Sequence, residues 1–186
     1  MNDPELPRRT LSPWWLLAVV FGAGWVAYLV FFLPRTTGPT VVSGQPAEFG
    51  WQLLDLDDGK VPFRRFQGKP IFLNIWATWC PPCVGEMPSI ARLASRPELN
   101  GVAFVCVSAD DSGQTVKRFL EGKNWPMTVL RATDAPKVFA TDGIPATFII
   151  APNGTIASAD VGSRDWDSPE TVSLLRRLLK ETPSKP

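Results

Sequence analysis

The sequence predicts an α/β domain in three layers with a central mixed sheet, preceded by an apolar N-terminal helix. Nearly all-apolar runs at 70–77 and 101–109 are each followed by a helical pattern, and a hairpin and an amphipathic helix close the chain. Residues 14–33 contain no charged side chain, which indicates a separate helix ahead of the domain. The 186 residues therefore divide into one globular domain and a preceding segment.

The stretch 14–33 is typical of a helix that spans a membrane. Its 20 uncharged residues match the length needed to cross a hydrocarbon core about 30 Å thick. Arg8 and Arg9 precede it and only Arg35 closely follows, so the positive-inside rule favours a short cytoplasmic N-terminus at residues 1–13. We therefore expect a single-pass anchor in the cell membrane, with the remainder extracytoplasmic, on the periplasmic side. A cleaved signal peptide is the alternative, but FFLPRTT offers no small-residue cleavage site.

The linker and the first strands follow the anchor. Residues 34–47 are rich in Pro, Thr and Gly and are typical of a linker, which leaves residues 48–186 for the domain. Two short strands are expected within 51–63, joined by a turn at 57–59. The apolar run 70–77 indicates a strand buried on both faces, as in a parallel sheet.

The remaining elements continue the alternation of helices and strands. A helix should begin after the cysteines and end at Arg96-Pro97. Next are expected a strand at 101–109, a helix at 111–122 capped by Asp111 or Ser112, a short strand at 127–130 and a short helix at 135–141. A hairpin within 146–162 should turn at Asn153-Gly154 with positive φ at both positions. Ser168 and Pro169 predict the cap and first residue of the closing helix.

Composition excludes several kinds of chemistry. The net charge is +1 with acidic and basic residues mixed along the chain, so no basic patch indicates nucleic-acid binding. The chain has no histidine, which removes the commonest metal ligand, the usual general base and the haem-attachment motif C-x-x-C-H. Catalysis must therefore use cysteine, carboxylate, lysine or backbone groups.

Residues 80–83, Cys-Pro-Pro-Cys, lie where the predicted strand stops and a helix should begin. The spacing is short enough for the two sulfurs to bond within one helical turn. Such a pair alone is compatible with a structural disulfide, a metal site or a catalytic dithiol.

The pattern around this pair resembles the thioredoxin superfamily and, within it, the membrane-anchored TlpA/ResA-like thiol-disulfide oxidoreductases. The resemblance covers roughly residues 45–179. It rests on FLNIWATWCPPCVGEMP almost entire and on Gly143-Ile144-Pro145 before the hairpin. It implies a thioredoxin-like fold with the redox disulfide as its only redox group, and no bound cofactor. A copper carrier of this fold would be expected to use a wider cysteine spacing and a histidine.

The chemistry of the cysteines agrees with the resemblance. Cys80 would lie at a helix N-terminus, where unpaired N–H groups and the helix dipole favour a thiolate, so we expect it to attack. Cys83 lies one turn inside, less exposed, and would resolve the mixed disulfide. A permanent disulfide would close too small a loop to add much stability, and zinc would lack ligands beyond Cys106. Cys106 is expected to be a small core residue, with a third redox partner as the alternative.

Glu86 is the predicted proton-exchanging group. It follows Cys83 by three positions, so the two should share an inward helix face. Thioredoxin has a buried aspartate where this chain has Asn74, and the resemblance to the ResA-like branch implies that the carboxylate has moved to the helix. There it would exchange protons with Cys83 and disfavour nearby thiolates. A solvated surface glutamate is the alternative, and we expect Asn74 to be satisfied by the backbone.

The resemblance implies three substrate-binding residues. In the superfamily the proline matching Pro145 is cis and faces the dithiol, which leaves the backbone of Ile144 free to pair with a bound peptide. Trp79 would cover the thiolate and supply apolar contact area.

The sequence thus predicts a membrane-anchored, extracytoplasmic thiol-disulfide oxidoreductase. The resemblance suggests a reductant of protein disulfides, such as those of apocytochrome c during cytochrome c maturation, recharged by a membrane electron-donor protein. The alternatives are a thiol oxidant, a peroxidase-like enzyme and a redox-silent anchored binding module. The dithiol, Glu86 and Pro145 argue against the silent module. They leave the redox direction open, because potentials in the superfamily span more than about 100 mV.

Overall fold

The computed structural model describes residues 14–32, 43–132 and 134–181. The chain divides into two compact units, residues 1–38 and 39–186. The predicted cytoplasmic segment 1–13 and residues 34–42 of the predicted linker lie outside the described residues.

The first unit contains the helix α1 (Trp14–Phe32), where the sequence predicts a helix. Several of its apolar side chains, including those of Phe21 and Trp25, are exposed. Within the part of the chain that the structure describes, no helix combines the length and the apolar character needed to cross a bilayer. The membrane anchor stays a prediction.

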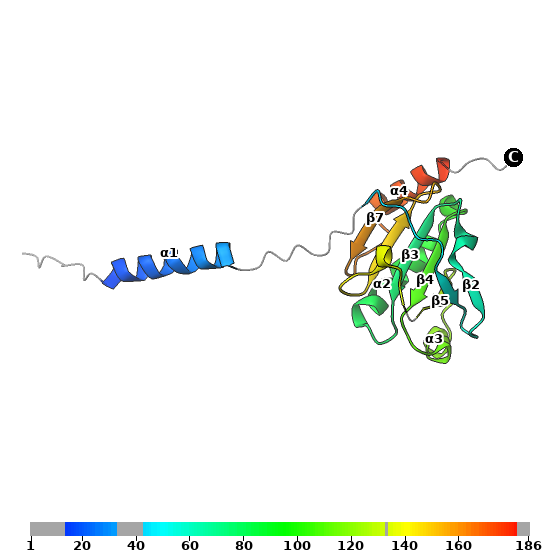
Figure 1. Cartoon of the computed structure of the whole chain (residues 1–186), viewed down its shortest axis with the longest axis horizontal. Helices are drawn as coiled ribbons and strands as arrows, with labels where there is room; N and C mark the ends of the chain where they lie inside the picture. Colours follow the sequence, from blue (N-terminus) through cyan, green and yellow to red (C-terminus); the bar gives the residue numbers. More distant parts are fainter. Residues whose placement is uncertain (1–13, 33–42, 133, 182–186) are drawn as a thin grey trace, which may run out of the picture. The chain divides into compact units, whose positions relative to one another are not determined.

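The second unit is built on one mixed sheet. Its strands, among the described residues, are β1 (Gln52–Leu54), β2 (Lys60–Pro62), β3 (Ile71–Trp76), β4 (Ala103–Ser108), β5 (Thr128–Arg131), β6 (Ala146–Ile150) and β7 (Ile156–Val161), in the order β2-β1-β5-β4-β3-β6-β7 (Figure 1). β3, β4 and β5 are parallel neighbours, whereas β6 pairs antiparallel with β3 and β7, and β1 with β2 and β5. The predicted mixed sheet is confirmed.

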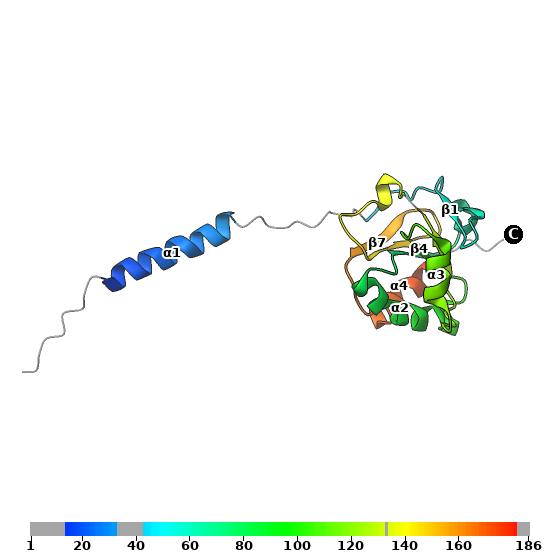
Figure 2. The same cartoon turned by 90° about the horizontal axis from the view of Figure 1, so that it is seen from below.

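The helices of this unit pack on one face of the sheet. They are α2 (Pro81–Ala94), α3 (Gly113–Leu120) and α4 (Pro169–Lys180), and all three contribute side chains to one buried cluster. Figure 2 shows α2 and α4 together on that side. The short turn η2 (Pro97–Leu99) follows α2.

Short 3₁₀ turns, η1 (Phe63–Phe66) and η3 (Lys137–Phe139), pack with the other face of the sheet. η3 replaces the short helix predicted at 135–141, because so short a segment forms too few hydrogen bonds to offset helix nucleation.

β3 separates the two cores, because successive side chains of a strand point to opposite faces. Phe72 and Trp76 pack with the helices, whereas Ile71 and Leu73 pack on the opposite side. Asn74 lies between Phe72 and Trp76 in this alternation, so its polar side chain points towards the helices. The strand therefore places an amide beneath α2.

The hairpin between β6 and β7 turns at Asn153 and Gly154 as predicted, but only Gly154 has a positive φ, of 88°. The expected positive φ at Asn153 was wrong. Its side-chain oxygen instead accepts from the N–H and hydroxyl of Thr155, at 3.0 and 2.7 Å. The loop closes from Ala151 to Thr155 and is longer than a two-residue turn, so one left-handed residue suffices.

The end of the predicted linker joins the fold. The N–H of Gly44 donates to the carbonyl of Ile156 at 2.7 Å, and the N–H of Ile156 donates to that of Gln45 at 2.9 Å. These are backbone contacts, so the side-chain composition of 34–47 gave no sign of them.

Gly113, the first residue of α3, provides a test of how closely α3 approaches the backbone of Leu56. A Cβ atom there would clash with the backbone carbonyl of Leu56, whereas a Cβ at Gly85 on the exposed side of α2 would meet nothing within 4 Å. We expect Gly113→Ala to lower the free energy of unfolding by about 1–3 kcal/mol. The matched control Gly85→Ala should raise it by about 0.4–1 kcal/mol. Urea denaturation measures both, and equal effects of the two variants would contradict the close approach of α3 to Leu56.

Candidate active site

Cys80 and Cys83 lie at the start of α2, where the sequence predicts them. Cys80 is the N-cap of the helix, and Cys83 is in the first turn. Their sulfurs form a disulfide with the Cα atoms 5.3 Å apart. Cys80 Sγ also accepts a hydrogen bond from the N–H of Cys83 at 3.3 Å. The first sulfur therefore occupies a position where the helix N-terminus favours negative charge.

The exposure of the two cysteines differs in the predicted order. Cys83 is fully buried and Cys80 is 5% exposed, so Cys80 is the more exposed of the two, although it is also buried. The covering group is the loop before β6, because the carbonyl oxygen of Ile144 lies 3.7 Å from Cys80 Sγ.

The same loop carries the other predicted substrate-binding residues. The Ile144–Pro145 peptide bond is cis, as the resemblance implies. Pro145 is buried, and Ile144 is half-buried beside Cys80 Sγ. Trp79 is 66% exposed, an unusual position for a large apolar side chain. The roles of these residues in binding a peptide stay predictions.

Glu86 is buried, with 2% of its surface exposed, which excludes the solvated alternative. Three N–H groups donate to its carboxylate: Asn74 Nδ2 to Oε1 at 2.8 Å, and Trp166 Nε1 and the backbone N–H of Arg164 to Oε2 at 3.0 and 3.3 Å. Cys83 lies one turn earlier on the same helix and is also buried. The predicted inward helix face is therefore confirmed.

Burial raises the pKa of Glu86, while the hydrogen bonds from Trp166, Asn74 and Arg164 act to lower it. Because the folded-state pKa lies above the unfolded value, the folded protein binds more protons between the two values. The contribution of Glu86 to stability is therefore complete below the unfolded pKa and is lost as the pH rises through the folded pKa.

Asn74 has different partners from those expected. Its Nδ2 donates to Glu86 Oε1 and, at 2.9 Å, to Thr147 Oγ1 on β6, whereas its Oδ1 has no hydrogen-bond partner among the described residues. The expectation of backbone partners was wrong, because the neighbouring strands already use the backbone groups around it in ladder hydrogen bonds. Asn74 is thus a donor to the buried carboxylate.

Sequence reasoning missed Trp166, which lies 80 residues from Glu86 in the chain. The available signal was a single tryptophan in the charged stretch SRDWDSP, just before a helix cap. A large aromatic residue among charged neighbours indicates a buried anchor. Its partner could not be identified from that pattern.

Asp110 was also missed. It is buried after the end of β4 and accepts from the N–H and hydroxyl of Thr78, at 2.9 and 2.6 Å. β3 and β4 are parallel, so their carboxyl ends meet at one edge of the sheet, which was the available signal. These bonds fix the loop that leads from β3 to Cys80.

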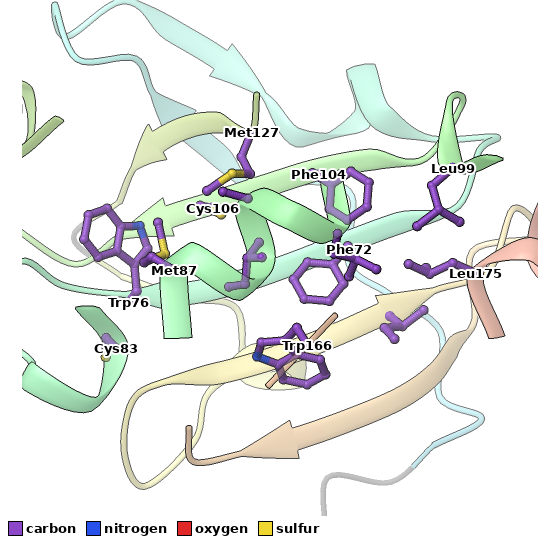
Figure 3. Packing of buried hydrophobic residues seen from close by; sticks show 14 of the residues in the cluster. Phe72, Trp76, Cys83, Met87, Leu99, Phe104, Cys106, Met127, Trp166 and Leu175 are labelled. Atoms are coloured by element: carbon purple, nitrogen blue, oxygen red, sulfur yellow. The ribbon is translucent and has the colours of Figure 1, made fainter. Parts of the chain in front are cut away.

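Cys106 lies on β4 as a free, fully buried thiol. Burial raises the pKa of this thiol, and the nearby charge of Glu86 raises it further. It is a core residue, as predicted, and it packs in the same cluster as Cys83 (Figure 3). Within the described ranges, no group of three or more His, Cys, Asp or Glu side chains is placed to hold a metal ion.

The chain is similar to known thiol-disulfide oxidoreductases. The Redoxin family model matches residues 35–178. The thiol-disulfide oxidoreductase ResA of Halalkalibacterium halodurans is 31% identical over 150 residues, which cover 79% of this chain and 83% of that protein. ResA of Geobacillus thermodenitrificans is 29% identical over 164 residues, covering 87% and 90% of the two chains.

A solved structure of a thiol-disulfide oxidoreductase is also similar to this chain. A candidate thiol-disulfide oxidoreductase from Bacteroides vulgatus superposes with a TM-score of 0.64 at 26% identity, covering 76% of this chain and 99% of that one. The disulfide at the start of α2 is the group such an enzyme requires. The chain therefore belongs to the Redoxin family, as a TlpA/ResA-like thiol-disulfide oxidoreductase of the thioredoxin superfamily whose substrates are protein thiols or disulfides.

Proposed function

We propose that this enzyme is a membrane-anchored, extracytoplasmic reductant of protein disulfides. The observation that carries the redox direction is the buried carboxylate of Glu86 on the same helix face as Cys83. When ionised it disfavours a nearby thiolate and thus the reduced pair, whereas strong oxidants of this superfamily stabilise their reduced form. A dithiol with a disfavoured reduced state gives up its electrons more readily.

The reaction uses both sulfurs. The Cys80 thiolate attacks one sulfur of the substrate disulfide, whose S–S bond breaks and releases a thiolate. Cys83 then attacks Cys80 Sγ, the mixed disulfide breaks and the second substrate thiolate leaves. The substrate gains two electrons, and the cysteine pair becomes the disulfide. Glu86 accepts the proton that Cys83 loses when it becomes the attacking thiolate.

A groove that is lined in part by Ile144 supports a protein substrate. It has a volume of about 260 Å³, and Ile144, Ile75 and Phe139 contribute apolar side chains to its lining. Because Ile144 also borders Cys80, a chain segment whose cysteine is attacked there can extend into the groove. We propose disulfides such as that of apocytochrome c as substrates, in cytochrome c maturation, on the resemblance to the TlpA/ResA-like branch.

The membrane anchor is proposed from the sequence of residues 14–33, which contain no charge. It would hold the domain near the outer face of the membrane, where a membrane dithiol protein supplies two electrons to regenerate Cys80 and Cys83. Both redox partners are thus proteins that meet the enzyme outside the cytoplasm.

A topology experiment tests the location. A reporter that is active only outside the cytoplasm, fused after Pro186 of the full-length chain, should be active and remain in the membrane fraction. Its control is the same fusion with two lysines inserted at Gly22, which should lose membrane retention because charges are costly in the bilayer core. Activity confined to the cytoplasm would overturn the proposed location, and a shortened released product would favour the cleaved signal peptide.

Alkylation tests the division of labour between the cysteines. In the reduced full-length chain at neutral pH, a mild alkylating agent should label Cys80 fastest, Cys83 slowly and Cys106 hardly at all, because only Cys80 combines some exposure with a helix N-terminus. Cys83→Ala should trap mixed disulfides through Cys80, and Cys106→Ala should leave this trapping unchanged. Mass spectrometry identifies the labelled sulfur, and trapping through Cys106 would refute the assignment.

Glu86→Gln tests the proton acceptor. The substitution keeps most of the shape and removes the titrating charge, so the cysteine titration should shift downward and lose its coupling to a second ionisation. The rate at which Cys83 displaces a partner from Cys80 should also fall, by about 10²-fold if Glu86 is a general base. Thiolate absorbance against pH and rapid-mixing kinetics measure the two effects. Superimposable titrations with unchanged rates would exclude Glu86 from the exchange.

A further inference from the structure

Trp166 contacts Glu86 from a segment that sequence reasoning did not connect with the active site. It lies between β7 and α4, its side chain is 1% exposed, and its indole Nε1 donates to Glu86 Oε2 at 3.0 Å. The ring also packs edge-on against Phe72 of β3, with centroids 5.2 Å apart (Figure 3). One side chain therefore contacts both the sheet and the carboxylate.

The backbone of this segment is tied to the same turn of α2. The N–H of Trp166 donates to Ser89 Oγ at 3.0 Å, and Ser89 Oγ donates to the carbonyl oxygen of Glu86 at 2.7 Å. The backbone N–H of Arg164 adds the other contact to Oε2. The segment thus contacts the side chain of Glu86 directly and its main-chain carbonyl through Ser89.

Ion pairs with Arg92 on α2 and with Arg96, just after that helix, also hold the segment. Arg96 Nε lies 2.6 Å from Asp167 Oδ1, and Arg92 lies 3.5 Å from both Asp165 and Asp167. Exposed pairs of this kind each contribute little to stability. They flank Trp166 on both sides in the sequence, so they favour one placement of the indole.

We propose that Trp166 is a positioning residue of the exchange reaction, whose indole N–H holds the Glu86 carboxylate in the orientation needed to exchange a proton with Cys83. This inference rests on the proposed role of Glu86. An N–H group that donates to a carboxylate stabilises its ionised form, so Trp166 sets both the position and the proton affinity of the group.

The described groups around Glu86 are mostly neutral. Cys83 lies one turn away on its own helix, Cys106 on β4 interacts with the Glu86 charge, and β3 and β6 present the neutral side chains of Asn74 and Thr147. The Arg164 guanidinium lies over the Trp166 ring, 4.8 Å from its centroid. The indole is therefore the side-chain donor to Oε2, and its removal should change the titration of Glu86 directly.

A purely structural role is the competing explanation, since a buried tryptophan usually finds some acceptor. Trp76 provides the comparison in the same cluster. It is fully buried, and its Nε1 has no hydrogen-bond partner among the described residues.

The test compares Trp166→Phe with the matched control Trp76→Phe in the full-length chain in mild detergent. Each variant loses a similar volume of buried ring, but only Trp166→Phe removes a donor to Glu86. We expect Trp166→Phe to raise the pKa of Glu86 by about one unit, because a hydrogen bond to a charged group has roughly that effect. Trp76→Phe should leave it unchanged. Carbon-13 resonances of the labelled glutamate carboxyl groups report this directly.

Thiol chemistry supplies the second readout. Trp166→Phe should change the cysteine titration in the same direction as Glu86→Gln, and should add nothing in a Glu86→Gln background. If Trp166 had only a structural role, Trp166→Phe would change the cysteine titration equally in the unmutated chain and in Glu86→Gln. If Glu86→Gln alone has no effect on the exchange, the proposed role of Glu86 fails. If it has an effect while Trp166→Phe leaves the carboxyl titration unchanged, the inference about Trp166 fails.

A measurement on the unmutated chain covers the case in which Trp166→Phe does not fold. The Nε1–H resonance of Trp166 should shift with pH through the ionisation of Glu86, and this shift should disappear in Glu86→Gln. A resonance that does not respond to pH across the titration of Glu86 would overturn the proposal.

Discussion

The arrangement of the active site depends on the buried carboxylate of Glu86. Glu86 has 2% of its surface exposed, and burial of an ionisable group is costly unless hydrogen bonds compensate it. The donors come from two separate parts of the chain, Asn74 on β3 and the segment that carries Arg164 and Trp166 after β7. A strand, the first helix of the domain and the segment before the last helix must therefore meet at one point.

This convergence also fixes the active pair, because Cys80, Cys83 and Glu86 all belong to the first turns of α2. Because Glu86 is held against the sheet, the N-terminus of α2 has a fixed position relative to the sheet. At that N-terminus, Cys80 Sγ lies 3.7 Å from the carbonyl oxygen of Ile144. The loop that enters the helix is fixed independently by Asp110, through its bonds to Thr78. Cys80 is thus held in place both by the loop that precedes it and by the helix that follows it, as pre-organised sites require.

Local patterns predicted much of this arrangement. The all-apolar run before the cysteines indicated β3, and the three-residue spacing from Cys83 to Glu86 indicated a shared inward face. The contact of Asp110 with Thr78 was missed, although the parallel pairing of β3 and β4 brings their carboxyl ends together. The contact of Trp166 with Glu86 could not be predicted, because it joins residues 80 positions apart and leaves no periodic pattern in the sequence. The partners of Asn74 were unpredictable for the same reason. The anchor and the redox direction depend on a bilayer and a partner protein, so they stay proposals.

The central claim is that ionisation of Glu86 is coupled to the dithiol. It is tested most directly by the reduction potential of the full-length chain measured against pH in a thiol redox buffer. An uncoupled pair that takes up two electrons and two protons has a potential that falls by about 59 mV per pH unit until the first thiol ionises. Because the charge of Glu86 disfavours a nearby thiolate, the account predicts that this change of slope occurs at a lower pH in Glu86→Gln than in the unmutated chain. A change of slope at the same pH in both chains would contradict it.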